Sequence, residues 1–189
     1  MNRRGFLAGA LGAGTATLAA PWLPAARAAT EEDLAFANFA AAGELLLEDF
    51  YDRAVAARVV TGPGRTALVR GRLAAREHAK ALELLLVGAG DVGPVAEDFA
   101  FAWPARTFRS TQATVATGLS VLRPLLGTYQ SAAASVTEPT HRVLYASLAA
   151  SAGQQIAALA WLGGRAGVQS FPVAIDLETA SAALERVLG

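Results

Sequence analysis

Few side chains in this chain of 189 residues could do chemistry, because it has two histidines and no cysteine. At about 100° per residue in a helix, His78 lies at the centre of an apolar face, and Gln155 lies on the apolar side of its own segment. Glu44 lies at the edge of an apolar arc that includes Tyr51, so both a solvated and a buried glutamate stay open. A lone histidine on an apolar face is more often a hydrogen-bonded core residue than a metal ligand.

Polar side chains on core faces need partners, since leaving a buried polar group unpaired costs about 1–3 kcal/mol. We therefore predict a core polar network in which His78, Gln155 and either Glu44 or Tyr51 satisfy one another. Tyr129 is predicted to belong to the same network.

Other chemistries find little support. Glu138 and His141 have a Glu-x-x-His spacing, but they lie at the very start of a helical segment with Pro139 between them. Gly62-Pro63-Gly64 and Gly88-Ala89-Gly90 lack the context of a phosphate-binding loop and are typical helix ends. Neither histidine has a serine placed by a recognisable nucleophile motif. We predict no catalytic residue and do not expect an enzyme.

Four long helical segments, rich in alanine and leucine, must position these side chains, and a short helix follows them. Thr30 is the expected N-cap of the first segment, because three acids follow it where the helix dipole favours them. The predicted segments run from Thr30 to about Val60, from Arg65 to Val87, from Ser110 to before Thr137, from Pro139 to Gly163-Gly164, and from Asp176 to Leu188.

Loop lengths predict the topology of an all-α protein. Short turns after the first and third helices force antiparallel neighbours, whereas residues 88–109 are long enough to run the length of a bundle. The expected fold is an antiparallel four-helix bundle with one long crossover and a short C-terminal helix. An internal repeat supports two similar hairpins, since a shift of 78 residues places Tyr51 on Tyr129 and a shift of 77 places Ala75 on Ala152.

The first 28 residues resemble a twin-arginine (Tat) export signal. Arg3 and Arg4 precede Phe6-Leu7 and a weak apolar stretch, and Ala26 and Ala28 are small residues suited to cleavage. We expect a signal at residues 1–28, one domain at residues 29–189, and a periplasmic or extracellular protein. An ordinary secretory signal and an uncleaved anchor stay open.

Composition excludes some partners of the exported part. Residues 1–28 contain three of the 16 basic residues and none of the 16 acidic ones, which leaves a net charge of −3. No basic stripe for nucleic acid remains. Without cysteine, stability must come from core packing rather than from disulfides. We expect no transmembrane span after cleavage of the signal.

Several motifs together resemble the ferritin-like superfamily, especially its exported bacterial members. They are Asn38-Phe39-Ala40, Glu44, Phe50-Tyr51, Asp98-Phe99-Ala100-Phe101, Phe108-Arg109-Ser110 and Gly127-Thr128-Tyr129. The resemblance covers most of residues 30–164 and rests on spacing and aromatic residues.

The resemblance implies a di-iron or di-manganese site built from four acids and two histidines. Glu44 and His78 stand at two of those six positions, which makes them vestigial metal ligands. The remaining positions are occupied by Ala75, Leu122, Ala152 and Gln155. Leu122 shares an unbroken apolar face with Leu119 and Leu125, so the pattern predicts that the di-metal site has been lost.

We therefore expect an exported, non-catalytic binding or structural protein of the cell envelope, without a cofactor. Its partner is an unidentified protein or small molecule, and self-association into a homo-oligomer stays open. The alternative is a metal-binding ferritin-like protein with an oxidoreductase or storage role, which holds one iron, manganese or zinc ion through Glu44 and His78.

The arginine pair provides a direct test of the predicted export route. Changing both Arg3 and Arg4 to lysine should leave the precursor inside the cell, because the Tat route depends on that pair. Fractionation and immunoblotting would measure the result, and unchanged export of the double variant would indicate the ordinary secretory route.

Overall fold

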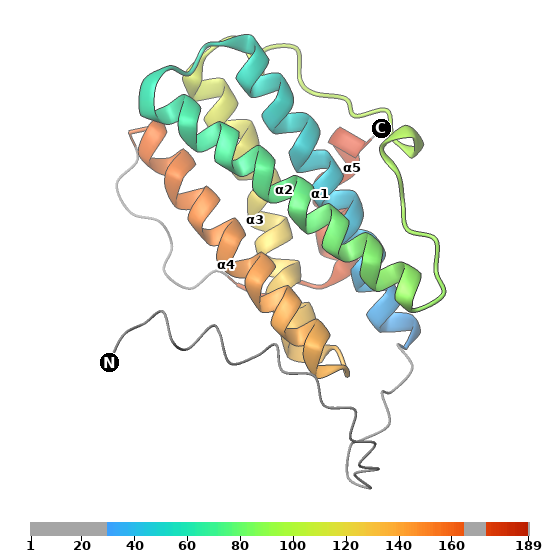
Figure 1. The fold of residues 1–189 in the computed structure, drawn as a ribbon. Coiled ribbons are helices and arrows are strands. Elements are labelled where there is room, and N and C mark those ends of the chain that lie inside the picture. Colours follow the sequence, from blue (N-terminus) through green and yellow to red (C-terminus); the bar gives the residue numbers. More distant parts are fainter. Residues whose placement is uncertain (1–29, 165–172, 189) are drawn as a thin grey trace, which may run out of the picture.

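The computed structural model describes residues 30–164 and 173–188, so the predicted signal at residues 1–28 lies outside the described residues. Every regular element within these ranges is helical, which confirms the prediction of an all-α bundle (Figure 1). The elements are α1 (Glu31–Ala57), α2 (Gly62–Gly88), a short 3₁₀ turn (Ala96–Asp98), α3 (Thr111–Ser135), α4 (Pro139–Leu162) and α5 (Leu177–Leu188).

The helix ends differ from the prediction mainly between α1 and α2. Helix α1 ends at Ala57 rather than near Val60, because Arg58 adopts a left-handed backbone conformation with φ of 57°. Helix α2 begins at Gly62, three residues before the predicted start, with Pro63 in its first turn. The connection therefore moves three residues toward the N-terminus but keeps its short length, and α1 and α2 are antiparallel neighbours (Figure 1).

Residues 89–110 connect α2 to α3 and travel along the bundle. Near the start of this connection, the Asn38 amide of α1 donates to the Asp91 carboxylate at 2.8 Å. Just after its end, the Thr111 hydroxyl donates to the Val59 carbonyl at 3.0 Å, beyond the opposite end of α1. The connection therefore spans the length of α1, and α3 runs antiparallel to α1 (Figure 1).

Aromatic side chains fasten this connection to α1. Phe50 is fully buried, and its ring centre lies 5.4 Å from that of Trp103 and 5.8 Å from that of Phe108. The indole N–H of Trp103 also donates to the Asp49 carboxylate. Such pairs contribute about 0.5–1.5 kcal/mol each beyond burial. Phe101, Trp103 and Phe108 are partly buried and pack against the core.

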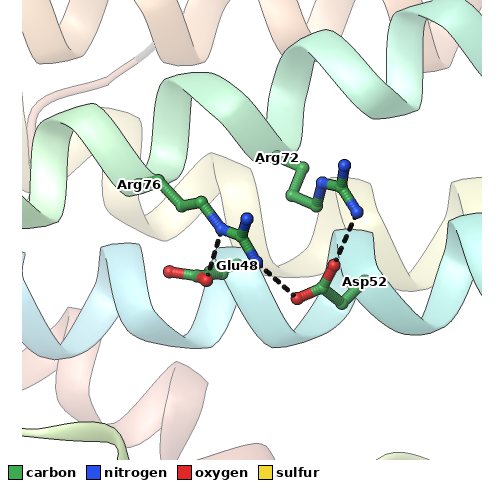
Figure 2. Close-up of polar contacts among 4 residues, drawn as sticks. All are labelled: Glu48, Asp52, Arg72 and Arg76. Carbon is green, nitrogen blue, oxygen red and sulfur yellow. Dashed lines mark hydrogen bonds and ion pairs between the residues drawn. The ribbon is translucent and has the colours of Figure 1, made fainter.

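An ion-pair network joins the solvent-facing sides of α1 and α2 (Figure 2). Arg76 donates to Glu48 at 2.6 Å and to Asp52 at 3.3 Å, and Arg72 donates to Asp52 at 3.0 Å. Exposed pairs of this kind contribute at most about 1 kcal/mol each, so the network aligns the two helices more than it stabilises them.

Helix α4 bears on the expectation of no transmembrane span after residue 28, which stays a prediction. Among the described residues, α4 is the one helix whose length and apolar composition would allow it to cross a membrane. Its mean hydropathy is 1.2 over its most apolar window. Its inner residues Tyr145, Leu148 and Leu159 are buried against the other helices. A core helix passes the same test of length and composition, and α4 packs against α2 and α3 in this bundle.

A buried aspartate holds one end of the bundle together. The Thr30 hydroxyl accepts from the Asp33 N–H at 3.1 Å, and the Asp33 carboxylate accepts from the Thr30 N–H at 3.2 Å. The same carboxylate accepts from the Thr137 hydroxyl at 2.7 Å and from the Thr137 N–H at 3.2 Å. Asp33 therefore ties the start of α1 to the turn between α3 and α4.

Replacing Asp33 by Asn should destabilise the protein by about 1–3 kcal/mol at neutral pH, because charged acceptors make the stronger hydrogen bonds. Burial acts to raise the pKa of Asp33, but hydrogen bonds from Thr137 and Thr30 outweigh it and hold the pKa below its usual range. The stabilisation is then complete above the usual carboxyl range near pH 4 and is lost as the pH falls through the lower folded-state pKa.

Urea unfolding of both proteins between neutral and acid pH would measure this difference. Exposed Glu32, one residue earlier in the same turn, provides the matched control Glu32→Gln. Equal destabilisation by both substitutions, or a difference that persists at the lowest pH, would contradict the role of Asp33.

Candidate functional site

Glu44 lies in the interior, where side chains from three helices meet. Only 1% of the residue is exposed, so the solvated alternative is wrong. The Tyr129 hydroxyl of α3 donates to Glu44 Oε1 at 2.8 Å, and His78 Nδ1 of α2 lies 3.3 Å from Oε2. The side chain of His78 is 20% exposed, so this group reaches from the core to the α2 surface.

A second polar group joins α1 to α4. The Tyr51 hydroxyl donates to Gln155 Oε1 at 2.7 Å, and Gln155 Nε2 donates to the Ser151 hydroxyl at 3.2 Å. No hydrogen bond in the described ranges links this group to the one around Glu44. The structure therefore places the five predicted residues in two separate groups, one with Glu44, His78 and Tyr129 and the other with Tyr51 and Gln155. The predicted pairing of His78 with Gln155 is not present.

Both tyrosines act as fixed hydrogen-bond donors. Burial raises the pKa of Tyr51 and of Tyr129, and the nearby Glu44 carboxylate raises both further. The phenols thus keep their protons throughout the physiological range. A protonated phenol can stabilise a buried carboxylate or amide, but it cannot serve as a general base.

A close approach of two helices lets Tyr51 cross the bundle. A Cβ atom built on Gly71 of α2 would lie 2.6 Å from the Tyr51 ring, so only glycine leaves room for the ring at this position. The ring passes beside α2, and its hydroxyl then reaches Gln155 of α4. The hydrogen bond between Tyr51 and Gln155 therefore depends on the missing side chain of Gly71.

The positions where the resemblance places further metal ligands are apolar and buried. Ala75, Leu122 and Ala152 are each at most 2% exposed. Across the residues that the structure describes, no group of three or more His, Cys, Asp or Glu side chains could hold a metal ion. Glu138 accepts from the Thr140 hydroxyl at 2.9 Å as the N-cap of α4, and no hydrogen bond or ion pair joins it to His141 in the described residues.

An open groove of about 750 Å³ lies between α2 and α4. Tyr51 and Gln155 form part of its floor, so one of the two polar groups is accessible to a ligand. The volume is in the range of small-molecule sites. The groove is lined by Tyr51, Pro63, Thr66, Ala67, Leu68, Arg70, Gly71, Ala74, Ser151, Gln154, Gln155, Ala158 and Leu159.

The sequence did not predict this groove or the Arg70 side chain that lines it. Small residues recur along one side of α2 at Ala67, Gly71 and Ala74, and they face Ser151 and Ala158 across the groove. Side chains of this size cannot fill the space between two helices. The spacing was visible in the sequence, but nothing in it shows that this face meets α4.

Substituting Gly71 by Ala should destabilise the protein and open the Tyr51–Gln155 hydrogen bond, because the added methyl group overlaps the tyrosine ring. Overpacking of this kind costs about 1–3 kcal/mol. Gly153→Ala on α4 is the matched control, since its added methyl group would meet no atom within 4 Å. That variant should be more stable by up to about 1 kcal/mol, because alanine favours helix over glycine. Thermal unfolding would measure both, and stabilisation by Gly71→Ala would contradict the packing described here.

Comparison of the chain with protein-family models, with curated proteins and with solved structures found no match in any of the three. The relation to the ferritin-like superfamily therefore rests on the motifs quoted from the sequence and stays a prediction.

Proposed function

We propose that this protein is an exported, non-catalytic bundle of the cell envelope that binds a small ligand in the groove between α2 and α4. The single observation that carries this proposal is the groove itself, of about 750 Å³, with the hydroxyl of Tyr51 and the amide of Gln155 at its floor. Concave sites with mostly apolar walls and a few convergent polar groups are typical of small-molecule binding.

The chemistry of the groove favours binding over catalysis. Within the described lining there is no His, Cys, Asp or Glu, so the groove offers no general base and no cysteine nucleophile. The phenol of Tyr51 keeps its proton, because burial raises its pKa. Amide and hydroxyl groups can orient a ligand without reacting with it.

The proposal includes a ferritin-like scaffold that has lost its di-metal site. Two antiparallel hairpins joined by a connection that spans the bundle support this assignment. Helix α4 begins 77 residues after α2, in agreement with the internal repeat. The burial of Ala75, Leu122 and Ala152 also supports it, since ligands to a central metal pair must project inward.

The export part of the proposal rests on the sequence of the first 28 residues. Arg3 and Arg4 support the twin-arginine route, which carries folded proteins across the inner membrane. A bundle without cysteine is suited to such a route, because its folding needs no disulfide.

One observation favours the metal-binding alternative. His78 Nδ1 and Glu44 Oε2 lie 3.3 Å apart, so two potential ligands already converge. Glu44 also accepts a hydrogen bond from Tyr129, and a metal there would need further ligands from solvent. Two protein ligands make a weak site, so this function ranks second.

Native mass spectrometry and metal analysis of protein purified from its own compartment would test the proposal. We expect an organic ligand that stays bound to the wild-type protein and is lost from Ala158→Phe, whose ring would fill the groove. Ala157→Phe is the control, since Ala157 is exposed and does not line the groove. Roughly one equivalent of iron, manganese or zinc that is lost from His78→Gln would instead establish the alternative.

A further inference from the structure

One positive charge in the groove has no partner. Arg70 is the single charged side chain among the described residues that line it, and it is exposed. It forms no ion pair with any residue in the ranges that the structure describes. Arg72 and Arg76 of the same helix differ in this respect, because Glu48 and Asp52 hold them on the α1 side (Figure 2).

The opposite wall of the groove explains why Arg70 is unpaired. Helix α4 carries no Asp, Glu, Lys or Arg from Val143 to Leu162. Thr66 and Ala74, one turn before and after Arg70 on α2, are uncharged as well. None of these neighbouring positions offers an acid to this guanidinium, so its charge is available to a ligand.

The polar floor of the groove offers hydrogen-bond donors. Gln155 Oε1 already accepts from Tyr51, and the Ser151 hydroxyl already accepts from Gln155 Nε2. Within the described part of the chain, the second amide hydrogen of Gln155 and the hydroxyl hydrogen of Ser151 donate no hydrogen bond. Together with Arg70, these groups favour a ligand that is rich in acceptors.

Apart from Thr66 and Gln154, the remaining residues of the lining are apolar. Pro63, Ala67, Ala74, Ala158 and Leu159 contribute hydrocarbon surface on both sides of the groove. From Pro63 to Ala74 the groove extends along roughly 16 Å of the α2 axis. A ligand that fills it therefore needs an extended apolar part as well as an acceptor group.

Resting on the proposed ligand-binding function, we infer that the groove takes an amphipathic carboxylate, with its hydrocarbon part along the α2 and α4 walls and its carboxylate on Arg70. Among the described residues that line the groove, Arg70 is the single cation, which matches a ligand with one negative charge. A planar guanidinium also pairs with a carboxylate through two parallel hydrogen bonds.

Three probes with the same alkyl chain and different heads would test this inference. Octanoate, octan-1-ol and octyltrimethylammonium are titrated into the isotopically labelled full chain, and the backbone amide signals of Gly71 and Gln155 report binding in the groove. Octanoate should bind most tightly. Arg70→Gln should weaken its binding about tenfold, because a charge-assisted hydrogen bond is lost, and should leave octan-1-ol unaffected.

Arg65→Gln is the matched control, since Arg65 is an exposed arginine of α2 that does not line the groove. It should leave octanoate binding unchanged. Equal binding of octan-1-ol, preference for octyltrimethylammonium, or an equal effect of Arg65→Gln would overturn the carboxylate inference while the ligand-binding function stands. Failure of all three probes to saturate the Gly71 and Gln155 signals would overturn both.

Discussion

A carboxylate in the middle of an apolar bundle must be satisfied from within, and much of this structure follows from that constraint. Transferring an unpaired charge from water to a protein interior is prohibitive, so Glu44 needs a donor that is always present. Tyr129 meets this need because burial raises its pKa and keeps its proton in place. Through Glu44 and its neighbour His78, α1, α2 and α3 are held in one register.

Small side chains shape the surface where α2 meets α4. Large side chains such as Phe50, Leu122 and Leu148 are fully buried in the interior, whereas alanine, glycine and serine make up much of the facing surfaces of α2 and α4 at the groove. Tyr51 lies across this gap because Gly71 leaves room for it. The small residues that make room for the Tyr51 ring thus also leave an open groove. The groove has a polar floor because the Tyr51 hydroxyl and its partner Gln155 lie there.

Helical periodicity and loop length were sufficient to predict the helices and the all-α class, because both signals are local. The burial of Glu44 could not be predicted, since its place on a helical wheel does not reveal that Tyr129 of another helix covers it. Likewise, the pairing of Tyr51 with Gln155 joins residues 104 apart in sequence. The apolar identity of Leu122 was correctly taken as a core position, because a long unbroken apolar face allows little else. The groove was missed because its shape depends on the size of side chains that meet only after the hairpins dock.

The connection between α2 and α3 has a consequence for the order of folding. Each hairpin joins helices through a few residues, so its contacts are local and can form quickly. Contacts between the hairpins must wait until residues 89–110 close a much larger loop. In this chain the contacts that close this loop are aromatic, since Trp103 and Phe108 pack on Phe50 of α1. The Ala102 N–H also donates to the Val187 carbonyl of α5. The two hairpins can therefore form before the core closes, and the C-terminal segment joins both, since Ile175 is hydrogen-bonded to Gly127 and Ser131 of α3.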